Sequence, residues 1–351
     1  IDERGDLGLR GDTDGRLEVF RLPGLVTVET LELALEDGDR VTKVVEDHDA
    51  PGLRAAATEA GQVLLFELSW ERLPGPPGEE RPVSVELGYP YDEAPRFFAR
   101  EPLQALALSD GSDRLVIAAL AGAQLVVETA NKRTNFLSGA VELDSRLVRQ
   151  DLDVQATALA VDGNQRWVVV GDSQGTLHRF TLPALDLVES VSLGLAPVTA
   201  LQTLTGGTSL IAGDAEGRLF QLFPVRGPND GFSLQPVRDF PALGAPVAAI
   251  FPEGRRRGFA AVSADGTWGL YHSTAGERLL HGELAMLPAA MAFPRRADQL
   301  VLAGAAGEVS RLWFDNPHPE VTVATLWRKV WYENYPEPRT IWQSTAANDS
   351  F

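Results

Sequence analysis

Two short arginine runs contain the side chains of this sequence that are best suited to binding an anion. They comprise Arg255, Arg256 and Arg257 in the first run and Arg295 and Arg296 in the second. Guanidinium groups bind carboxylate or phosphate through paired N–H donors, so we expect a docking patch for an acidic protein surface, lipid phosphates or a passing anion. The simpler alternative is a pair of solvated turns.

Other residue types that carry chemistry do not form a recognisable site. The five histidines lack the spacing of metal ligands: His48, His178, His272, His281 and His318. Residues 12–15 resemble the start of a calcium loop, but no bidentate glutamate follows at the right offset, so turn chemistry explains them better. Cysteine is absent, and neither a phosphate-binding loop nor a serine nucleophile elbow occurs. We therefore predict no catalytic, metal or cofactor-binding residues.

A ten-residue pattern recurs seven times and must position these side chains. Its best copies span residues 11–20, 171–180 and 213–222, where a small residue precedes a polar turn, a buried anchor and a bulky residue. The turn glycine, two residues before the anchor, permits a positive φ. The seven anchors are Leu17, Val63, Leu125, Leu177, Leu219, Trp268 and Val309. Because they recur every 41 to 62 residues, the pattern predicts short strands in a repeating blade.

The expected fold is an all-β, seven-bladed β-propeller of four-stranded blades with a short C-terminal tail. In the fifth blade we expect strands at 198–204, 209–215, 218–223 and 233–240. Too few residues precede the second strand of blade one to build its first, so an upstream segment or residues 340–344 must supply it. The arginine runs fall in equivalent turns of blades six and seven.

The composition argues against several kinds of partner. The formal charge of −18 argues against nucleic acid binding and disfavours anionic membranes. No apolar run of about 18 residues and no signal peptide occurs. Because the chain starts at Ile1 and has two methionines, we expect a segment of a longer polypeptide.

Two stretches depart from the repeat. Residues 88–102 contain Tyr89, Tyr91, Phe97 and Phe98 and are expected mainly to fill the gap between blades two and three, with a partner site as the alternative. The tail at residues 326–351 carries Trp327, Trp331, Tyr332 and Trp342. An i, i+4 tryptophan pair suits one face of a short helix, packed on the propeller or placed beside a membrane. The expected division is a propeller at 1–325 and a tail leading toward a transmembrane segment at 326–351.

The tail resembles the large, propeller-containing permease of phosphate ABC transporters of the PstC type. The resemblance lies in residues 326–338, LWRKVWYENYPEP, and 341–351, IWQSTAANDSF. It implies a non-catalytic extracytoplasmic domain on the periplasmic side of the bacterial inner membrane. The implied partners are the rest of the permease, its partner permease and the periplasmic phosphate-binding protein, with the ATPase subunits contacted only indirectly. No cofactor is implied.

The blades also resemble WD40 repeats. Residues 213–222, GDAEGRLFQL, occupy the place of the family's Ser-Gly-Ser-x-Asp-Gly-x-Ile-x-Leu-Trp stretch, without its Gly-His pair or repeated Trp-Asp. The alternative function is therefore a free-standing propeller scaffold for protein complexes. A propeller hydrolase or lyase is the least favoured reading, because no catalytic motif is present.

Overall fold

Each copy of the repeat builds one antiparallel sheet from consecutive hairpins. The computed structural model describes residues 7–22, 25–47, 52–74, 82–91, 95–137, 139–226, 231–253, 258–284, 288–293, 299–304, 309–313 and 343–346. Within these ranges the regular elements are all strands. The chain divides into two compact units, the first made of residues 1–8, 21–25 and 196–351 and the second of residues 9–20 and 26–195.

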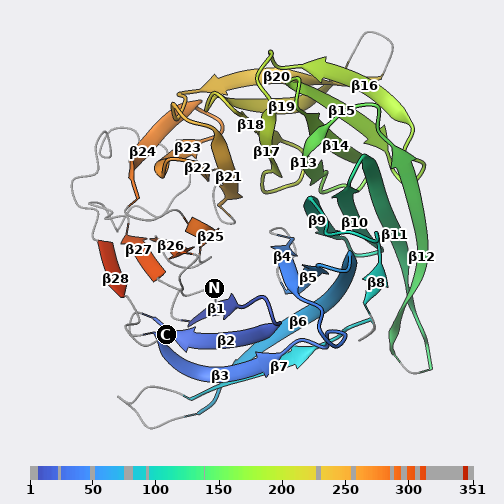
Figure 1. The fold of residues 1–351 in the computed structure, drawn as a ribbon, viewed down its shortest axis with the longest axis vertical. Coiled ribbons are helices and arrows are strands. Elements are labelled where there is room, and N and C mark those ends of the chain that lie inside the picture. Colours follow the sequence, from blue (N-terminus) through green and yellow to red (C-terminus); the bar gives the residue numbers. More distant parts are fainter. Residues whose placement is uncertain are drawn as a thin grey trace. The chain divides into compact units, whose positions relative to one another are not determined.

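Three sheets with four or more strands lie in the second unit (Figure 1). The first of these sheets also pairs the short strand β8 (Arg96–Phe97) onto β6. The first sheet otherwise consists of β4 (Val41–Glu46), β5 (Leu53–Thr58), β6 (Gln62–Arg72) and β7 (Val83–Gly88). The second consists of β9 (Ala105–Asp110), β10 (Arg114–Ala121), β11 (Gln124–Thr134) and β12 (Val141–Asp151). The third consists of β13 (Ala156–Val161), β14 (Trp167–Asp172), β15 (Thr176–Thr181) and β16 (Leu187–Ser192). The first strand β9 contacts both β4 and β13, so the sheets follow one another as blades do.

The first unit contains three more four-stranded sheets. They are built in the same order, and the first strands β17 and β21 again lie in contact. The strands are β17 (Val198–Thr203), β18 (Leu210–Asp214), β19 (Leu219–Arg226) and β20 (Phe232–Phe240); β21 (Val247–Pro252), β22 (Gly258–Ser263), β23 (Thr267–His272) and β24 (Glu277–Glu283); and β25 (Pro288–Ala292), β26 (Gln299–Gly304), β27 (Val309–Trp313) and β28 (Gln343–Ala346).

The number of complete blades corrects the prediction of seven. Among the described residues six sheets have at least four strands, whereas the first copy of the repeat builds only the three-stranded sheet of β1 (Leu7–Gly11), β2 (Arg16–Arg21) and β3 (Val26–Glu32). The all-β propeller architecture is confirmed, but in the part of the chain that the structure describes no further strand pairs with β1 to complete the sheet of the first copy. Residues 343 and 344 do not supply that strand, since β28 pairs with β27 as the fourth strand of another sheet.

The repeat places its anchors correctly. All seven anchors are buried, and so are the bulky residues Phe20, Phe66, Phe180, Leu222 and Tyr271. The small residue of the pattern is explained at Gly213, where an added Cβ would lie 2.6 Å from the Cβ of Val247 on the first strand of the next blade. The strand bounds predicted for the fifth blade agree with β17 to β20 to within three residues.

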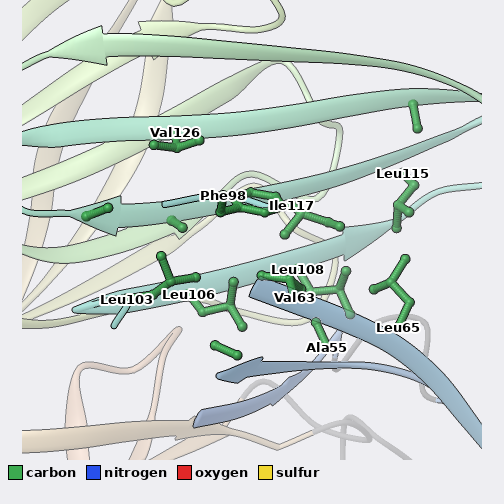
Figure 2. Close-up of a cluster of buried hydrophobic side chains, with 14 of the residues drawn as sticks. Ala55, Val63, Leu65, Phe98, Leu103, Leu106, Leu108, Leu115, Ile117 and Val126 are labelled. Atoms are coloured by element: carbon green, nitrogen blue, oxygen red, sulfur yellow. The ribbon is translucent and has the colours of Figure 1, made fainter. Parts of the chain in front are cut away.

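The core forms between neighbouring blades. Figure 2 shows one cluster in the second unit, which includes Leu65 from β6, Ile117 from β10 and Phe98 from the linker. Phe98 is fully buried, although it belongs to the linker and not to a four-stranded ladder. Packing of apolar blade faces on each other explains why strand alternation in the sequence is imperfect.

Candidate functional site

All the side chains proposed from the sequence as binding groups lie outside the described residues. This set comprises Arg255, Arg256, Arg257, Arg295, Arg296, Trp327, Trp331, Tyr332 and Trp342. The anion patch and the membrane-proximal aromatics therefore stay predictions. The candidate site developed below comes from side chains that the sequence reasoning did not select.

A polar network in the fourth blade accounts for His178. Its Nε2 lies 2.9 Å from Oδ2 of Asp172 and its Nδ1 lies 2.9 Å from Oγ of Ser190, so it joins β14, β15 and β16. Burial alone would raise the pKa of Asp172, but hydrogen bonds from His178 and from the backbone N–H groups of Thr176 and Gln174 outweigh burial and lower this pKa. These contacts fix the turn between the second and third strands of the blade.

The same turn chemistry recurs in other copies. Oδ1 of Asp214 accepts hydrogen bonds from the N–H groups of Glu216 and Arg218, each at 2.9 Å. Oδ1 of Asp12 accepts from the N–H groups of Asp14 and Arg16, each at 3.0 Å. An aspartate that satisfies two backbone donors stabilises a tight turn, which explains the calcium-loop resemblance of residues 12–15.

A buried ion pair joins blades two and three. Glu128 occupies the slot that is bulky and apolar in other copies, yet only 6% of its surface is exposed. Its Oε1 lies 3.3 Å from Nε of Arg96, which lies on the linker strand β8 that pairs with β6. The sequence shows that Glu128 departs from the repeat but gives no signal for its partner, because Arg96 lies 32 residues earlier.

The linker aromatics mostly pack between blades, as expected. Phe98 is fully buried, and its N–H donates to the carbonyl oxygen of Gly61 at 3.0 Å. Tyr91 packs against the same core, while the hydroxyl oxygen of Tyr89 accepts a hydrogen bond from the N–H of Ala34 at 2.8 Å. Phe97 is the exception, because about half of its surface is exposed. The interpretation that these rings fill the gap between blades two and three is thus confirmed for Tyr91 and Phe98, whereas Tyr89 packs against the cluster of blades one and two.

The hairpin of β11 and β12 projects beyond the rest of its sheet (Figure 1). Strand β10 pairs with β11 only as far as Asn131, whereas β11 and β12 remain paired to Thr134 and Val141. At about 3.3 Å per residue, the three additional pairs extend the hairpin by about 10 Å before its turn begins. We call residues 132–143 the blade-three hairpin.

Two large apolar side chains lie at the tip of the blade-three hairpin. Phe136 is 98% exposed and Leu137 is 100% exposed. The turn that carries them is held by Asn135, whose Oδ1 accepts from the N–H of Leu137 at 3.0 Å and whose backbone oxygen accepts from the N–H of Gly139 at 2.7 Å. Gly139 has a φ of 73°, which a residue with a side chain rarely adopts. The tip is therefore a defined turn that presents apolar groups.

The cations of the hairpin are already paired. Nζ of Lys132 lies 2.5 Å from Oδ1 of Asp110, and an Nη of Arg133 lies 2.5 Å from Oδ2 of Asp144. Burial alone would lower the pKa of Lys132, but interactions with Asp110 and Tyr91 raise it above its ordinary value. Lys132 is therefore held charged against the body of the blade and ties the base of the hairpin to it.

The sequence contained a usable signal for this tip. Phe136 and Leu137 stand between Asn135 and Gly139, both of which favour turns, and they lie outside the anchor pattern. Adjacent apolar residues in a turn are unusual because turns lie on the surface. The ten-residue pattern covers only the second and third strands of each blade and the turn between them, so it does not include this tip.

The described part of the chain contains no group of three or more histidine, aspartate or glutamate side chains placed to hold a metal ion. None of the described segments is a helix with the length and hydropathy needed to cross a bilayer.

Comparison with known proteins identifies the fold class. No protein-family model matches the chain, and no curated protein matches it. Among solved structures, the chain is similar to the β-propeller domain of Cps50 (Swd1) from Myceliophteria thermophila, with 12% identity and a TM-score of 0.58 over 88% of this chain and 93% of that one. Raptor from Chaetomium thermophilum matches with 14% identity and a TM-score of 0.58, over 86% of this chain and 26% of Raptor.

These matches define the class as a β-propeller. A computationally designed protein, Ika8, is also similar, with 18% identity and a TM-score of 0.50 over 87% of this chain and 80% of that one. At such low identities the likeness concerns the fold, and a propeller can carry many unrelated functions.

Proposed function

We propose that the chain is a non-catalytic scaffold that binds other proteins, with the blade-three hairpin as a principal binding element. The observation that carries this proposal is the pair Phe136 and Leu137, which are almost completely exposed beside the hydrogen bond from the Leu137 N–H to Oδ1 of Asn135. Burying such a side chain contributes about 1.5–3 kcal/mol, so the pair offers about 3–6 kcal/mol before the costs of association. Compact apolar anchors of this kind dominate the energetics of many interfaces.

The polar side chains of the blades support the same proposal. Asp172, Asp214 and Glu128 are buried and engaged in turns or in the ion pair between blades. Their arrangement stabilises a rigid support, and rigid supports hold binding loops in place. The hairpin is tied to that support through Lys132 and Asp110.

The test is quantitative affinity purification of the full-length natural protein from its own cells. Wild type is compared with the double substitution Phe136→Ser and Leu137→Ser, and with a control that replaces Leu187 and Val188, which are 56% and 44% exposed, by serine. We expect specific co-purifying proteins to be lost in the hairpin variant and kept in the control. Equal recovery from all three proteins would contradict the proposal.

A second hypothesis is that the chain is the extracytoplasmic domain of a phosphate-import permease. It is supported by the tail sequence at residues 326–351 alone. It would place the domain on the periplasmic side of the inner membrane, beside the phosphate-binding protein. Transmembrane helices encoded on both sides of this segment in the parent gene would support it, and a parent gene without them would exclude it.

The arginine patch belongs to this second hypothesis. Replacing Arg255, Arg256, Arg257, Arg295 and Arg296 by serine is expected to weaken binding of the phosphate-binding protein or of anionic liposomes. Unchanged binding of both would remove the patch from the account.

A further inference from the structure

We infer that the partner of the blade-three hairpin is a protein with an apolar pocket bordered by basic side chains. This inference rests on the proposed scaffold function and adds the chemistry of the partner surface. It combines the shape of the hairpin with the distribution of its charges.

The shape of the tip suits a recess better than a flat surface. Phe136 and Leu137 are adjacent, and they stand on a turn about 10 Å past the last residue of β11 that pairs with β10. Asn135 accepts hydrogen bonds from the N–H groups of Leu137 and Gly139, which restrain the backbone on both sides of the tip. A projecting pair of apolar side chains requires a complementary cavity to exclude water from both.

The charges of the hairpin determine what should surround that cavity. Lys132 and Arg133 are paired with Asp110 and Asp144. Glu142 accepts a hydrogen bond from the neutral side-chain amide of Asn135 at 3.1 Å, and it lies opposite Arg133, whose ion pair is formed with Asp144. The chain as a whole carries a formal charge of −18. Complementary potentials favour a basic rim on the partner, close to Glu142 when the tip is inserted.

The same charges argue against an anionic lipid surface as the partner. A tip that enters an acidic bilayer gains from unpaired cations that contact the headgroups. In this hairpin both cations, Lys132 at the base and Arg133, are engaged in ion pairs, and the chain as a whole carries a formal charge of −18. Binding of the tip to an anionic lipid surface would therefore overturn the inference.

The first experiment captures the partner in place. A photo-crosslinking phenylalanine analogue replaces Phe136 in the full-length natural protein, and a matched control carries it at Leu195, which is 93% exposed. We expect position 136 to crosslink a specific protein and position 195 to leave it uncaptured. A crosslink to a second copy of the chain would overturn the inference. Flotation of the purified protein with vesicles of phosphatidylcholine and phosphatidylglycerol, dependent on Phe136, would also overturn it.

The second experiment tests both parts of the chemistry with the purified captured protein. Leu137→Ser is expected to weaken the binding of the captured protein about tenfold to hundredfold, because one of the two apolar side chains no longer fills the pocket. Glu142→Lys is expected to weaken it further than Glu142→Gln, with a slower association rate. Unchanged affinity on Leu137→Ser would refute the apolar pocket, and tighter binding on Glu142→Lys would refute the basic rim.

The outcomes separate this inference from the proposed function. A partner captured from position 195 but not from position 136 would leave the scaffold function standing and end the inference about the hairpin. No specific protein from either position, together with none in the affinity purification, would end both.

Discussion

The buried ion pair between blades two and three offers the sharpest test of how the structure is held together. Removing Arg96 by the substitution Arg96→Leu would leave Glu128 as an uncompensated buried carboxylate. Breaking a buried pair in this way costs about 3–5 kcal/mol. We expect a value near 3 kcal/mol, because 16% of the Arg96 side chain remains exposed and water reaches the pair.

The double substitution tells an ion-pair effect from simple loss of packing. All six other copies of the repeat place a bulky residue where Glu128 stands, so Glu128→Leu restores the common pattern. Combined with Arg96→Leu it removes both charges, and replacing a buried pair by apolar residues is often neutral or stabilising. The double variant should therefore lie within about 1 kcal/mol of wild type.

The assay is urea unfolding of the four proteins of this double-mutant cycle, followed by fluorescence and circular dichroism. The coupling free energy between positions 96 and 128 should be about 2 kcal/mol or more. A cost below about 1 kcal/mol for Arg96→Leu, or a double variant as unstable as the single one, would refute the reasoning.

Three further predictions concern single side chains. Burial raises the pKa of Tyr271 to about 12 from a usual value of 10.0. The stabilisation that this shift contributes is therefore complete below pH 10 and is lost by pH 12, which amounts to up to about 3 kcal/mol of unfolding free energy. Tyr271→Phe should abolish this pH dependence in urea titrations. The pKa of Asp172 is lowered, so its stabilisation is present above about pH 4 and disappears as the pH falls; Asp172→Asn should flatten the acid side of the stability profile measured by thermal unfolding. Gly213→Val should lower the free energy of unfolding by about 1–3 kcal/mol or more, because the new side chain would collide with Val247, and unchanged urea stability would contradict the close packing of these blades.

The repeat made much of the fold predictable. Anchors such as Leu177 and Leu219 are buried because they lie on the side of the third strand that faces a neighbouring blade, and their regular spacing in the sequence indicates that side. The turn glycines, including Gly217 with a φ of 79°, record a local backbone requirement. Local requirements and strand periodicity are what a sequence expresses directly.

Features that depend on distant segments were missed or misjudged. Strand β28 completes the sheet of β27 across 29 intervening residues, and its pairing follows from tertiary contacts that no local pattern records. The partner of Glu128 lies on a linker strand, for the same reason. The exposure of Phe136 and Leu137 was not predicted, because it depends on where β10 stops pairing with β11. The length of a neighbouring strand cannot be read from the residues of the hairpin itself.

The central claim of this account is that the protein binds a partner through the apolar tip of the blade-three hairpin. The most direct measurement is the dissociation constant of the protein crosslinked from position 136, determined by interferometry for wild type, Phe136→Ser and the control Leu195→Ser. The account predicts that Phe136→Ser weakens binding about tenfold to hundredfold while Leu195→Ser leaves it unchanged. Equal dissociation constants for all three proteins would contradict it.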